Sequence, residues 1–108
     1  MAEQRTLGPS ADIPLGEGRT YTVDGREVAV FRTRSGQLFA TQARCPHKGG
    51  PLSDGLLGPK SLICPLHEWH FDLATGSAIQ GECGIQVYAI SEDPEGIMTL
   101  ALDKPGSA

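Results

Sequence analysis

Residues 45–58 read CPHKGGPLSDGLLG, and residues 64–68 read CPLHE. Each stretch holds one cysteine and one histidine, spaced as C-x-H in the first and C-x-x-H in the second. The first stretch also carries four glycines and two prolines and shows almost no alternation of apolar and polar residues. This composition predicts two stiffened, irregular loops that present a site. The candidate metal ligands in them are Cys45, His47, Cys64 and His67.

The sequence around these loops is typical of short β-strands. Residues 26–32 (REVAVFR) alternate between polar and apolar side chains, and a turn at residues 34–36 returns the chain as a second strand. One helical turn is predicted at residues 10–13, where Ser10 is a candidate cap. Short strands separated by regular turn signals predict an all-β sandwich or barrel. The predicted strands span residues 19–23, 26–32, 37–42, 61–64, 69–72, 84–90 and 97–102.

The length of the chain and the composition of its ends predict a single domain over residues 1–108. A chain of 108 residues buries enough surface to form one core without covalent staples. Residues 1–9 and 103–108 are rich in glycine, proline, serine and charged residues. We therefore expect these ends to fray and the ordered core to span about residues 10–103.

Charge and hydropathy argue against several classes of partner. Nine basic and 13 acidic residues give a net charge of −4, and no basic cluster is present, so we do not expect a nucleic-acid partner. No stretch reaches the roughly 20 apolar residues that a membrane span needs. Residues 1–10 also lack the apolar segment of a signal peptide. We expect a cytoplasmic protein, in which three cysteines favour metal binding over a disulfide framework.

Two kinds of metal centre are compatible with two cysteines and two histidines. In a structural zinc site all four side chains surround one ion, and the protein would be a zinc-stapled interaction module. In a 2Fe–2S centre of mixed ligation, the two cysteines hold one iron and the two histidines hold the other. One cysteine and one histidine in each loop favours the second arrangement, because two such loops can grip a two-iron cluster from opposite sides. Ligand type and spacing alone leave both open.

The residues that flank the ligands favour the iron–sulfur centre. The boxes CPHKGGPLSDG (45–55) and CPLHEWHFDLATG (64–76) resemble the two cluster-binding loops of the Rieske 2Fe–2S family. The approach DIPLGEGRTYTVDGREVAVFRTRSGQLFATQARCPH (12–47) and the strand GECGIQVYAI (81–90) extend the likeness. With the boxes, they are similar to the small subunit of cytoplasmic NAD(P)H-dependent nitrite reductase. The resemblance covers roughly residues 11–102.

The resemblance implies a particular fold and cofactor. The implied fold is all-β, with three small antiparallel sheets in the Rieske arrangement and a cluster-binding tip formed by residues 45–58 and 64–69. The implied cofactor is one 2Fe–2S cluster. Its thiolate ligands would be Cys45 and Cys64, and its imidazole ligands would be His47 and His67.

The resemblance also implies an electron-transfer subunit with no catalytic centre of its own. Its partner would then be a large subunit that carries flavin and siroheme and reduces nitrite to ammonia. The alternative is a ferredoxin that works between a reductase and an aromatic ring-hydroxylating dioxygenase, since those ferredoxins share the size and the two boxes. No Ser–His–Asp or paired-carboxylate arrangement stands out in the sequence that would indicate independent catalysis.

Two departures from the membrane-bound cytochrome branch of the family bear on the reduction potential. Gly50 and Leu66 occupy the places of a disulfide that joins the two loops in that branch. Trp69 and Phe71 stand where that branch has hydroxyl side chains that hydrogen-bond the cluster. Because fewer hydrogen bonds reach the sulfurs, we predict a potential near the low end of the Rieske range of about −150 to +300 mV.

Other residues near the boxes receive structural interpretations. His70 is predicted to be a strand residue near the site, and Cys83 a buried, inert thiol. Asp54 and Asp72 are predicted to cap turns through side chain–backbone hydrogen bonds. The glycines of the first loop, Gly55 among them, are expected to bring backbone N–H groups close to the cluster.

Overall fold

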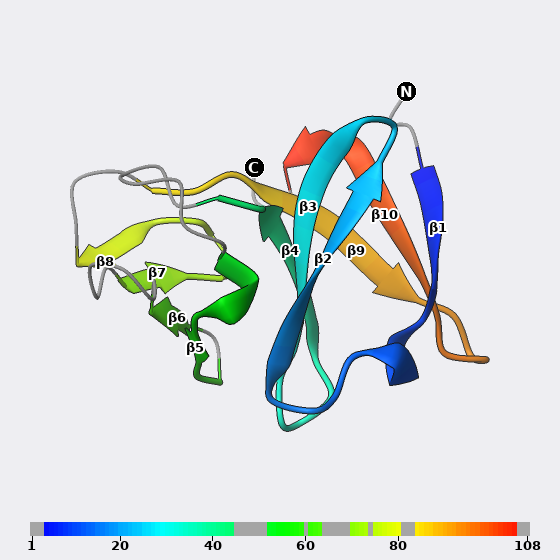
Figure 1. The fold of residues 1–108 in the computed structure, drawn as a ribbon, viewed down its shortest axis with the longest axis horizontal. Coiled ribbons are helices and arrows are strands. Elements are labelled where there is room, and N and C mark those ends of the chain that lie inside the picture. Colours follow the sequence, from blue (N-terminus) through cyan, green and yellow to red (C-terminus); the bar gives the residue numbers. More distant parts are fainter. Residues whose placement is uncertain are drawn as a thin grey trace.

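The computed structural model describes residues 4–44, 52–59, 61–63, 70–73, 75–80 and 84–105 (Figure 1). Within these residues the strand pairs are antiparallel, which confirms the predicted all-β class. The helical elements of the described residues are two 3-10 turns of three residues each, and neither has the length or apolarity of a membrane-spanning helix.

The strands form two sheets of different size. The large sheet contains β1 (Gln4–Pro9), β2 (Glu17–Val23), β3 (Arg26–Arg32), β4 (Leu38–Gln42), β9 (Val87–Glu92) and β10 (Ile97–Pro105). The small sheet contains β5 (Leu56–Leu57), β6 (Ser61–Ile63), β7 (His70–Asp72) and β8 (Ala78–Gln80). The turns are η1 (Ser10–Asp12) and η2 (Leu52–Asp54). In Figure 1 the small sheet lies at the left, the large sheet at the right, and the short coil of η2 between them.

The sheet topology differs in one respect from the three small sheets expected. The large sheet has the order β1-β10-β9-β4-β3-β2. Its centre is the pairing of β9 with β4, at Ala40 opposite Tyr88 and Thr41 opposite Val87. Strand β9 also pairs with β10. The pairing of β4 with β9 therefore joins two three-stranded groups, β1-β10-β9 and β4-β3-β2, into a single six-stranded sheet. The antiparallel pairing of the strands is otherwise as expected.

Strand β3 forms over the predicted residues 26–32 and is buried on both faces. Val28 and Val30 point into one core, whereas Ala29 and Phe31 point into another, and all four side chains are fully buried. A strand that reads as a continuous apolar run is typical of this two-sided burial. Burying each large side chain contributes about 1.5–3 kcal/mol. One strand therefore holds two hydrophobic clusters together.

The two cores divide the molecule between scaffold and site. The first, called the large-sheet core here, lies within the six-stranded sheet and contains Ile13, Val23, Val28, Val30, Ala40, Met98 and Leu100. The second, called the junction core, joins the large sheet to the small one and contains Ala29, Phe31, Phe39, Leu52, Leu62, Phe71, Leu73 and Ile85. The junction core thus fixes the small sheet and η2 against β3 and β4.

The N-terminal end is more ordered than expected. We predicted that residues 1–9 fray, but residues 4–9 form β1 and pair with β10, and β10 itself continues to Pro105. Backbone pairing does not require apolar side chains, so a polar segment can form an edge strand. The Arg5 guanidinium also lies 2.9 Å from the carboxylate of Asp24, at the β2–β3 turn.

Ser10 does not cap the helical turn, contrary to the prediction. The N-cap position of η1 is Pro9, and no side chain caps the turn. Ser10 is instead the first residue inside η1, where its buried hydroxyl donates a hydrogen bond to the Glu92 carboxylate. The reason is the position of the turn, which begins at Ser10 itself, one residue earlier than a Ser10 cap would require.

Candidate metal centre

The four candidate ligands lie outside the described residues, as do Trp69, Cys83, Gly49 and Gly50. The structure describes the stems from which the two ligand loops leave and to which they return. The first loop leaves after Arg44, two residues beyond the end of β4, and returns at Leu52. The second connects β6 to β7.

The first stem is closed by backbone and side-chain hydrogen bonds. The Leu52 amide donates to the Ala43 carbonyl oxygen at 2.9 Å, which ties the start of η2 to the end of β4. The Gln42 side-chain amide donates to the Arg44 carbonyl at 2.7 Å, and its oxygen accepts from the Gln86 amide at 2.8 Å. The residue that precedes Cys45 is therefore held to both β4 and the segment that leads into β9.

The second stem is a β-hairpin. Ile63, directly before the loop, pairs with His70, directly after it. Directly opposed residues of an antiparallel pair lie about 4.5–5.5 Å apart between Cα atoms. Residues 64–69, which carry Cys64 and His67, therefore start and end at neighbouring positions of one sheet.

The two stems meet at Gly55. A Cβ atom on Gly55 would lie 2.5 Å from the Ile63 carbonyl oxygen and 3.1 Å from that of Leu52. The Gly55 amide donates to the Leu52 carbonyl at 3.0 Å, so the predicted N–H donation from Gly55 to the cluster is wrong. The closeness needed here is between two backbone segments, and glycine permits it.

The η2 turn is also fixed from the side of the large sheet. Leu52 is fully buried in the junction core. The hydroxyls of Ser53 and Thr20 share a hydrogen bond of 2.9 Å, which links η2 to β2. These contacts, together with those of Gly55, give the first loop a rigid base on both of its sides.

The donor set and the stems fit a two-iron cluster. Two thiolates and two imidazoles match the mixed ligation of such a centre. The described ends of the two loops lie side by side, since Gly55 follows the first loop and is close to Ile63, which precedes the second. Among the described residues no group of three or more histidine, cysteine, aspartate or glutamate side chains is placed to hold a metal. The candidate centre therefore rests on the sequence prediction of Cys45, His47, Cys64 and His67, which lie outside the described residues.

Residues around the second loop follow the structural interpretations in part. His70 is the first residue of β7, half-buried, and pairs with Ile63 and Gln80, as expected of a strand residue. Asp72 accepts a hydrogen bond from the Thr75 amide at 3.1 Å, which confirms its predicted capping role. The side chain of Asp54 lies outside the described set.

Phe71 lies in the junction core. The sequence resemblance predicts that Phe71 lies beside the cluster, at a position where another branch of the family has a hydroxyl side chain. In the structure its side chain is fully buried, in the same cluster as Leu62 and Leu73. Its ring therefore supports the small sheet from the inner side. Trp69, the other residue predicted to stand in place of a hydroxyl side chain, lies outside the described residues.

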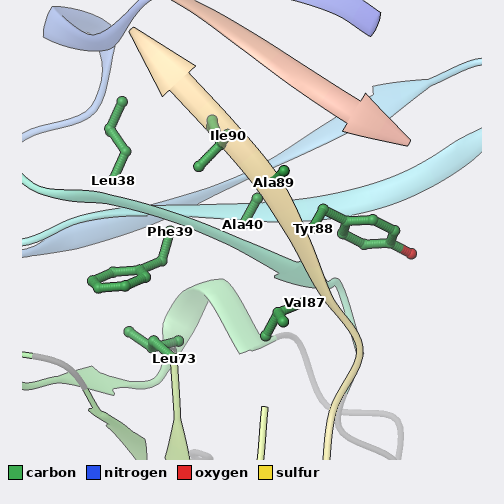
Figure 2. A pocket seen from close by; sticks show the side chains of 8 residues that line it. All are labelled: Leu38, Phe39, Ala40, Leu73, Val87, Tyr88, Ala89 and Ile90. Carbon is green, nitrogen blue, oxygen red and sulfur yellow. The ribbon is translucent and has the colours of Figure 1, made fainter. Parts of the chain in front are cut away.

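A cavity of about 300 Å³ lies where β4 and β9 diverge (Figure 2). Figure 2 shows Phe39 and Leu73 on one side of β4 and Leu38 and Ile90 on the other. The first two belong to the junction core, and the other two pack against the large-sheet core. The cavity is thus a gap where the two cores adjoin. Its lining residues are Leu38, Phe39, Ala40, Leu73, Val87, Tyr88, Ala89 and Ile90.

A buried tyrosine hydroxyl lies on the scaffold. The Tyr21 hydroxyl on β2 is buried and has no hydrogen-bond partner among the described residues. Burial raises the pKa of Tyr21 above its usual 10.0, and the negative charge of Asp12 raises it further. Tyr21 packs against the large-sheet core, so this perturbed pKa belongs to the scaffold.

Sequence reasoning predicted the four ligands, which lie outside the described residues, but it missed the residues that hold the stems together. Gln42, Leu52 and Gly55 received no role as stem contacts. Leu52 carries a detectable signal, since it is an apolar residue inside a polar, glycine-rich loop. The role of Gly55 depends on a contact with β6 that only the tertiary structure reveals.

Comparisons with known proteins show which family and which fold the chain resembles. The profile of the Rieske [2Fe–2S] domain matches residues 4–90. The ferredoxin component of a naphthalene 1,2-dioxygenase system from Pseudomonas aeruginosa is 38% identical over 68 residues, which cover 63% of this chain and 64% of that protein. The chain thus spans somewhat less than two thirds of the length of this relative.

Solved structures show the same fold. The ferredoxin of Sphingomonas yanoikuyae B1 is 27% identical and superposes with a TM-score of 0.77, covering 95% of this chain and 100% of that one. A protein of Mycobacterium tuberculosis, assigned as the small subunit of an NADH-dependent nitrite reductase, has a TM-score of 0.87 at 24% identity. That superposition covers 96% of this chain and 98% of the other. At this identity, the likeness shows a shared fold.

Proposed function

The chain belongs to the Rieske [2Fe–2S] domain family, and on that premise we propose that it is a one-electron carrier whose cluster is held by Cys45, His47, Cys64 and His67. The observation that carries the proposal is the family match over residues 4–90, which spans both cysteine–histidine pairs. The cofactor of this family is one 2Fe–2S cluster, as the ligand pattern predicts.

The four ligand side chains differ in charge, and this difference assigns each pair to one iron. Cys45 and Cys64 would bind one iron as thiolates, and His47 and His67 would bind the other through neutral imidazoles. The cluster supplies reversible one-electron chemistry when bound. Because imidazole brings less negative charge than thiolate, the two histidines favour a higher potential than four cysteines would give. The stems at Leu52 and at Ile63–His70 fix where the loops begin and end.

For the partner, we propose first the large subunit of an NAD(P)H-dependent nitrite reductase, which would carry flavin and siroheme. The support is the sequence resemblance described above, which extends from the approach strands through both boxes to residue 102. The full-length fold likeness to the Mycobacterium tuberculosis protein is consistent with this choice. The chain would then bring electrons into nitrite reduction to ammonia.

A second candidate is a ferredoxin that serves an aromatic ring-hydroxylating dioxygenase. The observation that favours it is the 38% identity to the naphthalene dioxygenase ferredoxin component. Both candidate functions use the same one-electron chemistry and differ only in the partner protein that receives the electron. A partner assay therefore decides between them, whereas spectroscopy of the isolated chain does not.

The first experiment tests the cluster itself. Anaerobically purified protein should be red-brown, contain about two irons and two sulfides per chain, and show a rhombic Rieske-type electron paramagnetic resonance (EPR) signal after reduction. A Cys45→Ser variant should lose that signal, while Cys83→Ser, a matched change outside the boxes, should keep it. A colourless protein with one zinc, which does not take up a cluster on reconstitution, would replace the proposal with the zinc-stapled module.

A histidine variant tests the ligand assignment more finely. His67→Cys should keep a cluster but lower its midpoint potential, because thiolate is the more negative ligand. His70→Cys, three residues away, is the matched control and should leave the potential unchanged. An equal potential in His67→Cys and wild type would show that His67 is not a ligand.

The second experiment tests the partner. Reduced protein is mixed under anaerobic conditions either with a flavin- and siroheme-containing nitrite reductase subunit or with a terminal ring-hydroxylating oxygenase. Rapid reoxidation by the siroheme protein, with nitrite consumed, would support the first candidate. Rapid reoxidation by the oxygenase alone would support the second.

A further inference from the structure

We propose that Gly55 is a positioning residue that sets the separation between the two ligand loops. The proposal rests on the function proposed above, because it assumes that both loops bind one cluster. It concerns the described stems, and it assigns Gly55 no direct contact with the metal centre.

The geometry of Gly55 leaves no room for a side chain. An added Cβ would lie 2.5 Å from the Ile63 carbonyl oxygen, 3.0 Å from the Leu62 side chain and 3.1 Å from the Leu52 carbonyl oxygen. Cβ atoms in proteins essentially never approach other heavy atoms closer than 3.0 Å. The nearest of these atoms is backbone, which cannot rotate away as a flexible side chain could.

The two backbone segments that would have to part are the stems of the two loops. Leu52 is the residue at which the first loop returns, and its amide is bonded to Ala43. Ile63 is the last residue before the second loop, and it is paired with His70. A Cβ on Gly55 would therefore push η2 and β6 apart, and each segment would move one ligand loop. A bridged two-iron cluster has a fixed ligand-to-ligand span, so this separation has to match it.

A second glycine provides a matched control. A Cβ on Gly84 would lie 2.4 Å from the Gly76 carbonyl oxygen, a backbone overlap of nearly the same size. Gly84 lies in the segment that leads into β9, and the backbone that its Cβ would displace, at Gly76, belongs to neither stem. Both glycines have a backbone φ that alanine can adopt. Gly55→Ala and Gly84→Ala therefore differ mainly in what the displaced backbone carries.

The test compares the two variants in the full chain with its cluster. Gly55→Ala should shift the EPR g-values and the midpoint potential, and should lose iron to a chelator on the order of tenfold faster than wild type, as outer-shell changes at metal sites do. Gly84→Ala should lower the thermal stability of the metal-free chain but keep wild-type g-values, potential and iron retention. Equal spectra, potentials and iron retention in the two variants would overturn the proposal.

A gentler pair keeps the proposal testable if Gly55→Ala does not fold. Leu52→Val loosens η2 itself in the junction core, and Leu73→Val removes the same methylene from the same core at a residue outside η2. The proposal expects altered g-values and iron retention in Leu52→Val only. Identical behaviour of the two valine variants would show that the position of η2 does not matter to the cluster. A wild-type chain that binds no cluster would instead refute the proposed function.

Discussion

The two sheets of this molecule reach stability by different means. The large sheet has strands of five to nine residues, with continuous registers such as the seven pairs between β2 and β3. The small sheet has strands of only two or three residues. Short strands supply few ladder hydrogen bonds, so the small sheet depends on the junction core beneath it. The large sheet can hold itself together, whereas the small one is held in place.

This difference predicts unequal consequences for equal core changes. Leu62 and Leu100 are both fully buried, Leu62 in the junction core and Leu100 in the large-sheet core. Truncation of either to alanine should cost about 2–5 kcal/mol of unfolding free energy. Only Leu62→Ala should also lose iron faster, because Leu62 contacts the position of Gly55 between the stems. Chemical denaturation and chelator kinetics measure the two effects, and equal iron loss in both variants would erase the distinction.

A smaller effect is expected when a hydroxyl is placed in the junction core. Phe71→Tyr should lower the free energy of unfolding by about 1–3 kcal/mol, because it buries a polar group in an apolar cluster. Since the Phe71 ring lies in the junction core, the midpoint potential should stay at the wild-type value. Redox titration is the measurement that checks this. A raised potential would mean that the added hydroxyl reaches the cluster and that the ring faces the site after all.

On the scaffold side, Tyr21→Phe should stabilise the protein by about 1 kcal/mol, since it removes a buried hydroxyl without a partner among the described residues. Burial raises the pKa of Tyr21, so the folded chain holds this proton more tightly than the unfolded chain. The corresponding stability is full below the unfolded pKa and is lost as pH rises toward the folded pKa. Denaturation from about pH 9 to about pH 11 should show a smaller loss for Tyr21→Phe than for wild type.

The smallest effect is expected at the edge of the large sheet. Arg5→Gln removes a half-exposed ion pair with Asp24 and should change the unfolding free energy by less than about 1 kcal/mol. Strand β1 should remain paired, because its backbone hydrogen bonds to β10 do not involve this side chain. Hydrogen exchange at β1 amides is the measurement. Loss of protection there would show that the ion pair, and not backbone pairing, holds the strand.

Much of the scaffold could be predicted from the sequence because its signals are local. Strand β3 falls on the predicted residues 26–32, since an apolar run between polar residues and a following turn mark it clearly. The family motifs likewise lie in contiguous residues, so the boxes around Cys45 and Cys64 point to the cofactor without a structure.

The unpredicted features depend on contacts between distant residues. Strand β1 has no apolar pattern and forms because β10, some 90 residues away, offers an edge for it. The single large sheet depends on the pairing of β4 with β9, two strands that are separated in the sequence by all four strands of the small sheet. The inward direction of Phe71 and the close approach at Gly55 depend on how the two sheets pack. None of these relations leaves a mark in a short window of sequence.

The pairing of β4 with β9 also makes the cluster-bearing region a removable insert. Gln42 and Gln86 are hydrogen-bonded neighbours, and the whole small sheet lies between them in the chain. A short turn in place of residues 43–86 would convert β4 and β9 into an ordinary hairpin and leave the order of the large sheet intact. The shortened protein would expose Ala29, Phe31 and Phe39 to water. Polar replacements at these three positions would therefore be needed to keep it from aggregating. For protein engineering, the large sheet is therefore a scaffold that should accept pairs of cluster-binding loops from other proteins of the same fold.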